Sequence, residues 1–176
     1  MKKLFLVVFS LTINVDSFAA FESTYEPLQS EKVLFINGNI LDGEGNELLD
    51  TDLLIGDGKI IAIGKGIGVE DKDVKIIDAK NKWITPGIID IHSHMGVYPA
   101  PSVRTSSDGN EATSPVTAEV WAEHSMWVQD PQYALALKGG ITTFHVLPGS
   151  ANLIGGRGVT VKNLQRNTIQ SMKYPD

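Results

Sequence analysis

Two apolar runs, separated by a long loop and a short helix, constrain this fold most. Residues 87–91 (GIIDI) and 141–147 (ITTFHVL) are nearly continuous apolar runs, which is typical of buried parallel strands. Between them lie residues 97–115, rich in Pro, Ser, Thr, Asp and Gly, and a helical pattern over 131–138. This order predicts one crossover of a parallel α/β sheet.

The helix between the two runs has clear boundary signals. Asp130 is an N-cap residue, and Pro131 is suited to the first helical position. Gly139 and Gly140 end the helix. Residues 117–128 (TAEVWAEHSMWV) also predict a short helix.

Before residue 86 the chain has a β pattern. Asp57-Gly58 between two apolar runs is the strongest hairpin signal, since both residues tolerate the positive φ of a type I′ turn. Asn37-Gly38 indicates another turn, which closes the first strand. We therefore expect a small antiparallel β unit over residues 32–85, with strands at 32–36, 40–41, 52–55, 59–63, 74–77 and 82–84.

The N-terminus has the pattern of a secretory signal. Lys2 and Lys3 precede ten mainly apolar residues, 4–13, and small residues stand at Ser17 and Ala19. Ten residues are too few to span a bilayer of about 30 Å. We expect residues 1–19 to be cleaved near Ala19, giving a periplasmic protein with no membrane anchor. Residues 20–31 are polar and predict a linker.

Composition excludes several kinds of site. The 176-residue chain contains no cysteine, so a metal site must be built from histidine and carboxylates. Its formal net charge of −6 argues against a nucleic-acid partner.

One motif carries metal chemistry. Because alternate strand residues share a face, Asp90, His92 and His94 are expected to point the same way at the end of the first apolar strand. Two neighbouring imidazoles can bind one cation. The alternative interpretation is a pair of partly exposed histidines at a strand end.

These segments together resemble the metal-dependent amidohydrolase superfamily. Residues 83–94 (WITPGIIDIHSH) are similar to the entry strand of its barrel, and the turns within 37–79 are similar to its N-terminal β domain. Residues 139–143 (GGITT) and 147–152 (LPGSAN) resemble the second barrel strand and its loop in the imidazolonepropionase-like branch. The resemblance covers residues 32–173.

The resemblance implies an α/β chain with a small β-sandwich-type domain over 32–85. The first strands of a (β/α)₈ TIM barrel follow over 86–176. His92 and His94 would be metal ligands. The function would be hydrolysis of a C–N bond by metal-activated water, in an amide, cyclic amide or amidine, or dipeptide-like small molecule. The cofactor would be a divalent metal, with zinc favoured over manganese, iron or nickel.

Length is where the chain departs from the family. A complete barrel needs about 250 residues, whereas 86–176 holds 91. We expect an N-terminal fragment of a protein that forms a homo-oligomer when complete. No catalytic residue is assigned within this fragment, and it would lack the later metal ligands. It would expose sheet edges and apolar faces and be inactive alone.

Four further residues are candidates for lining the site. His145 lies on the second barrel strand, where a hydrogen-bonded core histidine is the alternative. Ser150, Asn152 and Arg157 lie on the following loop, which borders the active site in a barrel. Arg157 is suited to a substrate carboxylate, with an exposed surface arginine as the alternative.

Two other functional interpretations stay open. The chain can be a noncatalytic remnant or metal-binding module of the same fold. It can also be another barrel hydrolase with a His-X-His strand, such as a phosphotriesterase-like enzyme or a deacetylase.

Overall fold

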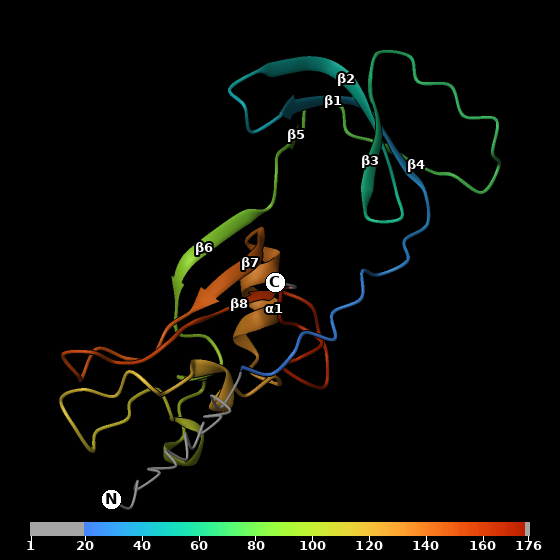
Figure 1. Cartoon of the computed structure of the whole chain (residues 1–176). Helices are drawn as coiled ribbons and strands as arrows, with labels where there is room; N and C mark the ends of the chain where they lie inside the picture. The colour runs from blue at the N-terminus through green and yellow to red at the C-terminus, as the bar shows by residue number, and fades with distance from the viewer. Residues whose placement is uncertain (1–19, 175–176) are drawn as a thin grey trace, which may run out of the picture.

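The computed structural model describes residues 20–174, so the expected leader over 1–19 lies outside the described residues. Figure 1 shows a curved β-sheet body and, below it, a body that contains a second sheet and a helix. The first body is the β domain expected over 32–85. Its strands are β1 (Val33–Leu41), β2 (Glu47–Gly56), β3 (Lys59–Gly64), β4 (Lys75–Asp78) and β5 (Trp83–Ile84).

The β2–β3 hairpin has the expected turn. The strands pair antiparallel around Asp57 and Gly58, whose φ angles are 52° and 70°. Positive φ at both positions is what a type I′ turn requires. The sequence prediction of this hairpin is confirmed.

Two expectations for the β domain need correction: that all its strands are antiparallel, and that they form a sandwich. We expected an antiparallel, sandwich-type unit, but the described strands form one sheet in the order β3-β2-β1-β4, with β5 also on β1. Strands β4 and β5 run parallel to β1, because the connection after β3 carries the chain back to the start of β1. Pairing with successive parts of β1 extends one sheet instead of building a second.

The Asn37-Gly38 turn is a bulge within a strand. β1 continues through both residues, with register shifts on either side of Gly38. Asn37 has a φ of 60°, and its N–H donates to Asp52 Oδ1 over 3.0 Å. The buried Asp52 carboxylate also accepts from Ile67 N over 3.0 Å. Asp52, on β2, therefore stabilises the positive φ of Asn37, and β1 continues past this residue.

The second body contains the expected crossover. β6 (Ile88–Ser93) pairs parallel with β7 (Ile141–Val146), and β8 (Val159–Lys162) adds to β7 antiparallel. Helix α1 (Gln132–Lys138) lies between β6 and β7 in the chain. This arrangement confirms the parallel α/β start, and no closed barrel forms within residues 20–174.

Helix α1 begins one residue later than expected, after Pro131, and ends at Lys138 as expected. It packs on β7. Asp130 Oδ1 accepts from Gln132 N over 2.9 Å, and Gly140 follows with a φ of 90°. The Tyr133 ring stacks on Phe144 at 5.4 Å. These two rings belong to a buried core with Val97, Ala122, Val146, Val159, Val161, Ile169 and Met172.

Within the described residues, no helix is long and apolar enough to cross a membrane.

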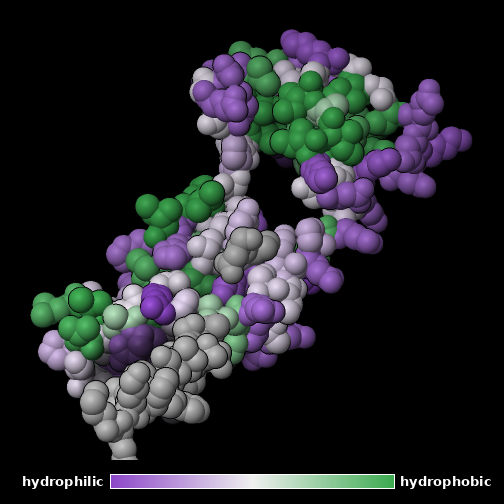
Figure 2. Space-filling model, viewed as in Figure 1, coloured by the Kyte–Doolittle hydropathy of each residue, from purple (hydrophilic) through white to green (hydrophobic). Residues whose placement is uncertain are grey.

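Strand β6 is parallel as expected, but it is not buried. Ile89 is 63% exposed and Ile91 is 77% exposed, and Figure 2 shows a hydrophobic strip along this strand. β6 is the last strand of its sheet, so described residues pair with it on one side only. The apolar faces expected of a partial barrel are therefore seen.

The predicted helix over 117–128 is wrong except for one 3₁₀ turn, η2 (Ala122–His124). Another 3₁₀ turn, η1 (Arg104–Ser106), lies in the long loop. The backbone around η2 bonds to the loop after β7 instead of to itself. Thr117 N donates to Ile154 O over 2.8 Å, and Ala122 N donates to Arg157 O over 2.9 Å. These tertiary partners replace the i to i−4 bonds of a helix.

The expected linker over 20–31 is fastened at its start. Buried Glu123 accepts from Phe21 N over 2.9 Å through Oε1. Lys173 Nζ donates to Phe21 O over 2.7 Å and lies 3.1 Å from Glu123 Oε2. Ser23 Oγ donates to the Lys173 carbonyl over 2.7 Å. This segment therefore ties the start of the described chain to its end before reaching β1 (Figure 1).

Candidate metal site

The two motif histidines lie side by side where β6 ends. His92 is the penultimate residue of β6, and His94 follows its final residue, Ser93. The centroids of their rings are 5.3 Å apart, and the ring planes are 84° apart. Both rings line a pocket of about 300 Å³, whose other wall is the loop after β7.

A main-chain carbonyl determines which nitrogen of His94 is available. Nδ1 lies 2.9 Å from the Leu147 carbonyl oxygen. Because a carbonyl oxygen only accepts, Nδ1 carries the proton of the neutral ring, and Nε2 keeps its lone pair. The ring edge also packs against Tyr98, with centroids 5.6 Å apart. His94 is therefore oriented for coordination through Nε2.

Asp90 does not share the pocket with the histidines. Its Oδ1 accepts from His92 N over 3.1 Å, and the β6–β7 register shifts between Asp90 and Ser93. The irregularity interrupts strict alternation, which was the basis for placing Asp90 beside the histidines. The carboxylate fixes the backbone of His92 instead.

The donor set suits a metal but is incomplete. Imidazole nitrogen binds zinc and other transition metals, and His92 and His94 present two such rings to one pocket. A catalytic zinc site normally has three protein ligands. Across residues 20–174, no three His, Cys, Asp or Glu side chains gather in a way that could hold a metal ion. Within the described residues, the donor set is therefore the pair of His92 and His94.

Ser150 and Asn152 lie in the same pocket as the histidines. They belong to the loop after β7, which carries Leu147, the partner of His94. The parallel β6–β7 pairing brings this loop beside the end of β6, because Ser93 is opposite Val146. These two candidate residues are thus close to His92 and His94.

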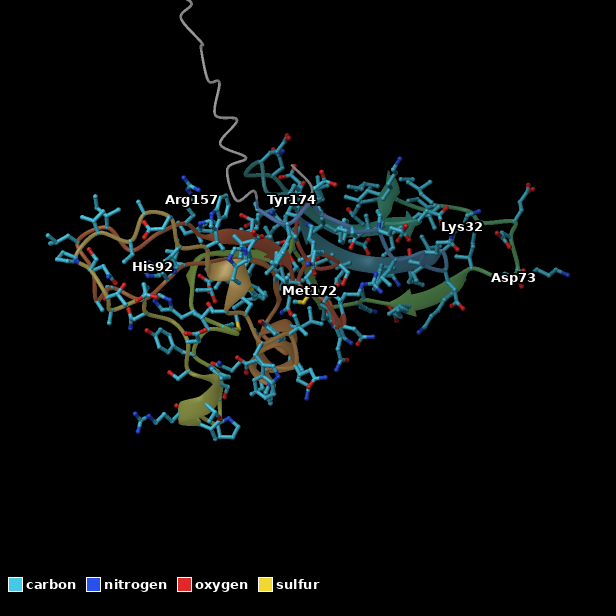
Figure 3. The ribbon with its side chains drawn as sticks, turned by 60° about the horizontal axis from the view of Figure 1, so that its bottom comes forward. Lys32, Asp73, His92, Arg157, Met172 and Tyr174 are labelled. Carbon is cyan, nitrogen blue, oxygen red and sulfur yellow. The ribbon has the colours of Figure 1, made fainter. Side chains whose placement is uncertain are left out.

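His145 and Arg157 lie outside the histidine pocket. His145 Nδ1 is 3.0 Å from Thr160 Oγ1, on β8, and its ring lines a separate pocket with Trp121 and Tyr174. The Arg157 guanidinium lies over the Trp121 ring, 4.7 Å from its centroid, and extends outward in Figure 3. In the described chain, neither residue adds to the pair of histidines.

Sequence reasoning missed two neighbours of His94. Tyr98 stands four residues further along the chain, but nothing in its spacing indicates that it returns to the ring. The Leu147 carbonyl was predictable in principle, since it follows a strand expected to pair parallel with β6. Every residue has a main-chain carbonyl, so the identity of residue 147 gives no sign of this contact.

No protein-family model matches this chain. The amidohydrolase tasK of Hapsidospora irregularis is 35% identical over 114 residues, 64% of this chain and 12% of the relative. A dihydroorotase of Bacillus cytotoxicus is 34% identical over 117 residues, 66% of this chain and 21% of the relative. A crystal structure of an amidohydrolase from Thermotoga maritima matches with a TM-score of 0.70 and 36% identity, over 82% of this chain and 37% of that one.

The relatives of this chain are amidohydrolases. These relatives are hydrolases of C–N bonds. They are consistent with the resemblance of the sequence motifs to the metal-dependent amidohydrolase superfamily. The chain spans about an eighth and a fifth of the two curated amidohydrolase relatives. The likeness to the Thermotoga amidohydrolase extends over 82% of this chain.

Proposed function

We propose that the complete protein is an exported, metal-dependent amidohydrolase that hydrolyses a C–N bond of a small molecule. One observation carries the proposal: His92 and His94 share a pocket, with their ring centroids 5.3 Å apart. The amidohydrolase relatives support the reaction class. Export to the periplasm rests on the signal pattern of residues 1–19.

The residues of this chain have separate roles in the proposal. His92 and His94 hold a divalent metal, zinc by preference. When bound, such a metal polarises a scissile carbonyl and lowers the pKa of water. The Leu147 carbonyl keeps the proton on His94 Nδ1, 2.9 Å away, so that Nε2 stays unprotonated. Asp90 holds the backbone N–H of His92 through Oδ1. Ser150 and Asn152 form the facing wall.

The proposal is tested by assaying the complete protein against a panel of cyclic ureides, N-acyl amino acids and dipeptides. Chelation should abolish C–N hydrolysis, and added zinc should restore it. Replacing His92 and His94 together by Ala should lower kcat/KM at least about 1,000-fold, since several kcal/mol of transition-state stabilisation is lost.

His124→Ala is the matched control, because its exposed ring contacts Phe21 away from the pocket. It should keep wild-type activity. Full hydrolysis by the double-histidine variant would overturn the metal assignment. Metal binding without hydrolysis of any substrate would instead favour a metal-binding remnant.

A further inference from the structure

Asn152 is fixed by two main-chain carbonyls on the facing loop. Its Nδ2 donates to Glu111 O over 2.5 Å and to Ser114 O over 2.7 Å. The neighbouring Ala151 N donates to Asn110 Oδ1 over 3.2 Å, and Gly149 N donates to Gly109 O over 2.6 Å. The two loops are therefore fastened along several residues, so the Asn152 side chain has a defined place.

The same contacts determine the orientation of the Asn152 amide. Carbonyl oxygens accept hydrogen bonds and cannot donate them, so the NH₂ group must face Glu111 and Ser114. Both protons of this group are then used, and the side-chain oxygen lies on the other branch of the amide. Within residues 20–174, Oδ1 receives no hydrogen bond.

Asn152 stands between two different surroundings. Ser114, one of its carbonyl partners, lines a hollow between residues 112–115 and residues 150–153. Asn152 lines that hollow too, but it also lines the pocket with His92 and His94, where Glu111 and Ser114 are absent. The one polar atom of Asn152 that Glu111 and Ser114 leave free is thus an acceptor, Oδ1, whose natural ligand is an N–H or O–H donor.

We propose that Asn152 Oδ1 is a specificity-determining acceptor, which selects substrates that carry an N–H beside the scissile C–N bond. This inference rests on the proposed hydrolase function and narrows its substrate class to secondary amides and cyclic ureides. A tertiary amide has no hydrogen to offer at that position. A site built to bond an N–H rejects an analogue that lacks it, because the site's own polar atom then stays unpaired.

Hydantoin and 1,3-dimethylhydantoin test this proposal, since they share a ring and differ in having N–H groups. Their binding to the complete protein is measured by calorimetry, with and without added zinc. We expect hydantoin to bind at least about 10-fold more tightly, which is the size of one well-made hydrogen bond. In Asn152→Ala this ratio should fall to about one.

Asn110→Ala is the matched control. It removes the side chain that accepts from Ala151 N and contacts Tyr98, so it loosens the same loop pair. Asn110 does not line the histidine pocket. Any loss of affinity should therefore affect both ligands equally and leave their ratio unchanged.

Three results would overturn the inference: equal affinities in the wild type, a ratio that survives Asn152→Ala, or no binding of either ligand at millimolar concentration. Turnover and metal content, measured on the same samples, keep it separate from the proposed function. Ligand discrimination without hydrolysis would count against the function alone. Hydrolysis without discrimination would count against Asn152 alone.

Discussion

At the residue scale, the orientation of His94 depends on a contact from a different strand's loop, because its Nδ1 lies 2.9 Å from the Leu147 carbonyl oxygen. The His92 and His94 pair was predictable because two imidazoles, separated by one residue, stand at the end of an apolar strand. Asp90 was placed incorrectly, since alternation cannot anticipate a register shift in the β6–β7 ladder. The buried Glu123–Lys173 pair was also missed. Its members are 50 positions apart, and only tertiary packing brings them together.

The Asp52 carboxyl makes the stability of the fold depend on pH. The backbone N–H of Asn37, with a second from Ile67, holds the pKa of this carboxyl below its usual range. Because the folded pKa is the lower one, the carboxylate stabilises the fold above the unfolded pKa of about 3.9, and this contribution is lost as pH falls through the folded pKa.

Urea unfolding between pH 7 and pH 2.5 measures this effect. Asp52→Asn should lower the midpoint at pH 7 and flatten its decline below about pH 4. Asp73→Asn is the control, since Asp73 is exposed at the far end of the β domain (Figure 3). An acid-dependent decline that is the same in wild type and Asp52→Asn would contradict this role.

At the element scale, local signals predicted the elements that make their own hydrogen bonds. The β2–β3 hairpin and helix α1 carry their turn and cap residues within the sequence. The helix expected over 117–128 fails because the loop after β7 takes its backbone groups. The parallel direction of β4 and β5 was equally hidden, since it depends on where the connection after β3 returns.

Gly58→Val tests the hairpin. Val resists a φ of 70°, so the free energy of unfolding should fall by about 1–3 kcal/mol. Gly68→Val is the control, because a Cβ there meets open space and its φ is not positive. Chemical denaturation followed by circular dichroism compares the two. Equal stability of Gly58→Val and wild type would rule out the positive-φ turn.

At the scale of the whole molecule, the described chain shows a β domain and the beginning of a barrel. The closed barrel that the family resemblance implies is not formed by residues 20–174. This was predictable from length, since a barrel needs about 250 residues. The exposed isoleucines of β6 and the two-histidine donor set are consequences of the same arrangement.

The apolar strip of β6 should make this chain self-associate when it is expressed alone. Ile91, with 77% of its surface exposed, is the residue to change. Ile91→Thr should reduce the weight-average mass in analytical ultracentrifugation without lowering stability. Ile40→Thr, at a buried position of β1, should instead destabilise the fold. Unchanged association of Ile91→Thr would exclude the strip as its cause.

Metal content per chain tests whether His92 and His94 are metal ligands. The complete protein, purified without chelators and dialysed against zinc, is compared with His92→Ala, His94→Ala and His124→Ala by plasma mass spectrometry. We expect at least one tightly held metal per chain in wild type and His124→Ala, and its loss in each of the other two variants. Equal metal content in all four proteins would contradict the assignment of His92 and His94 as ligands.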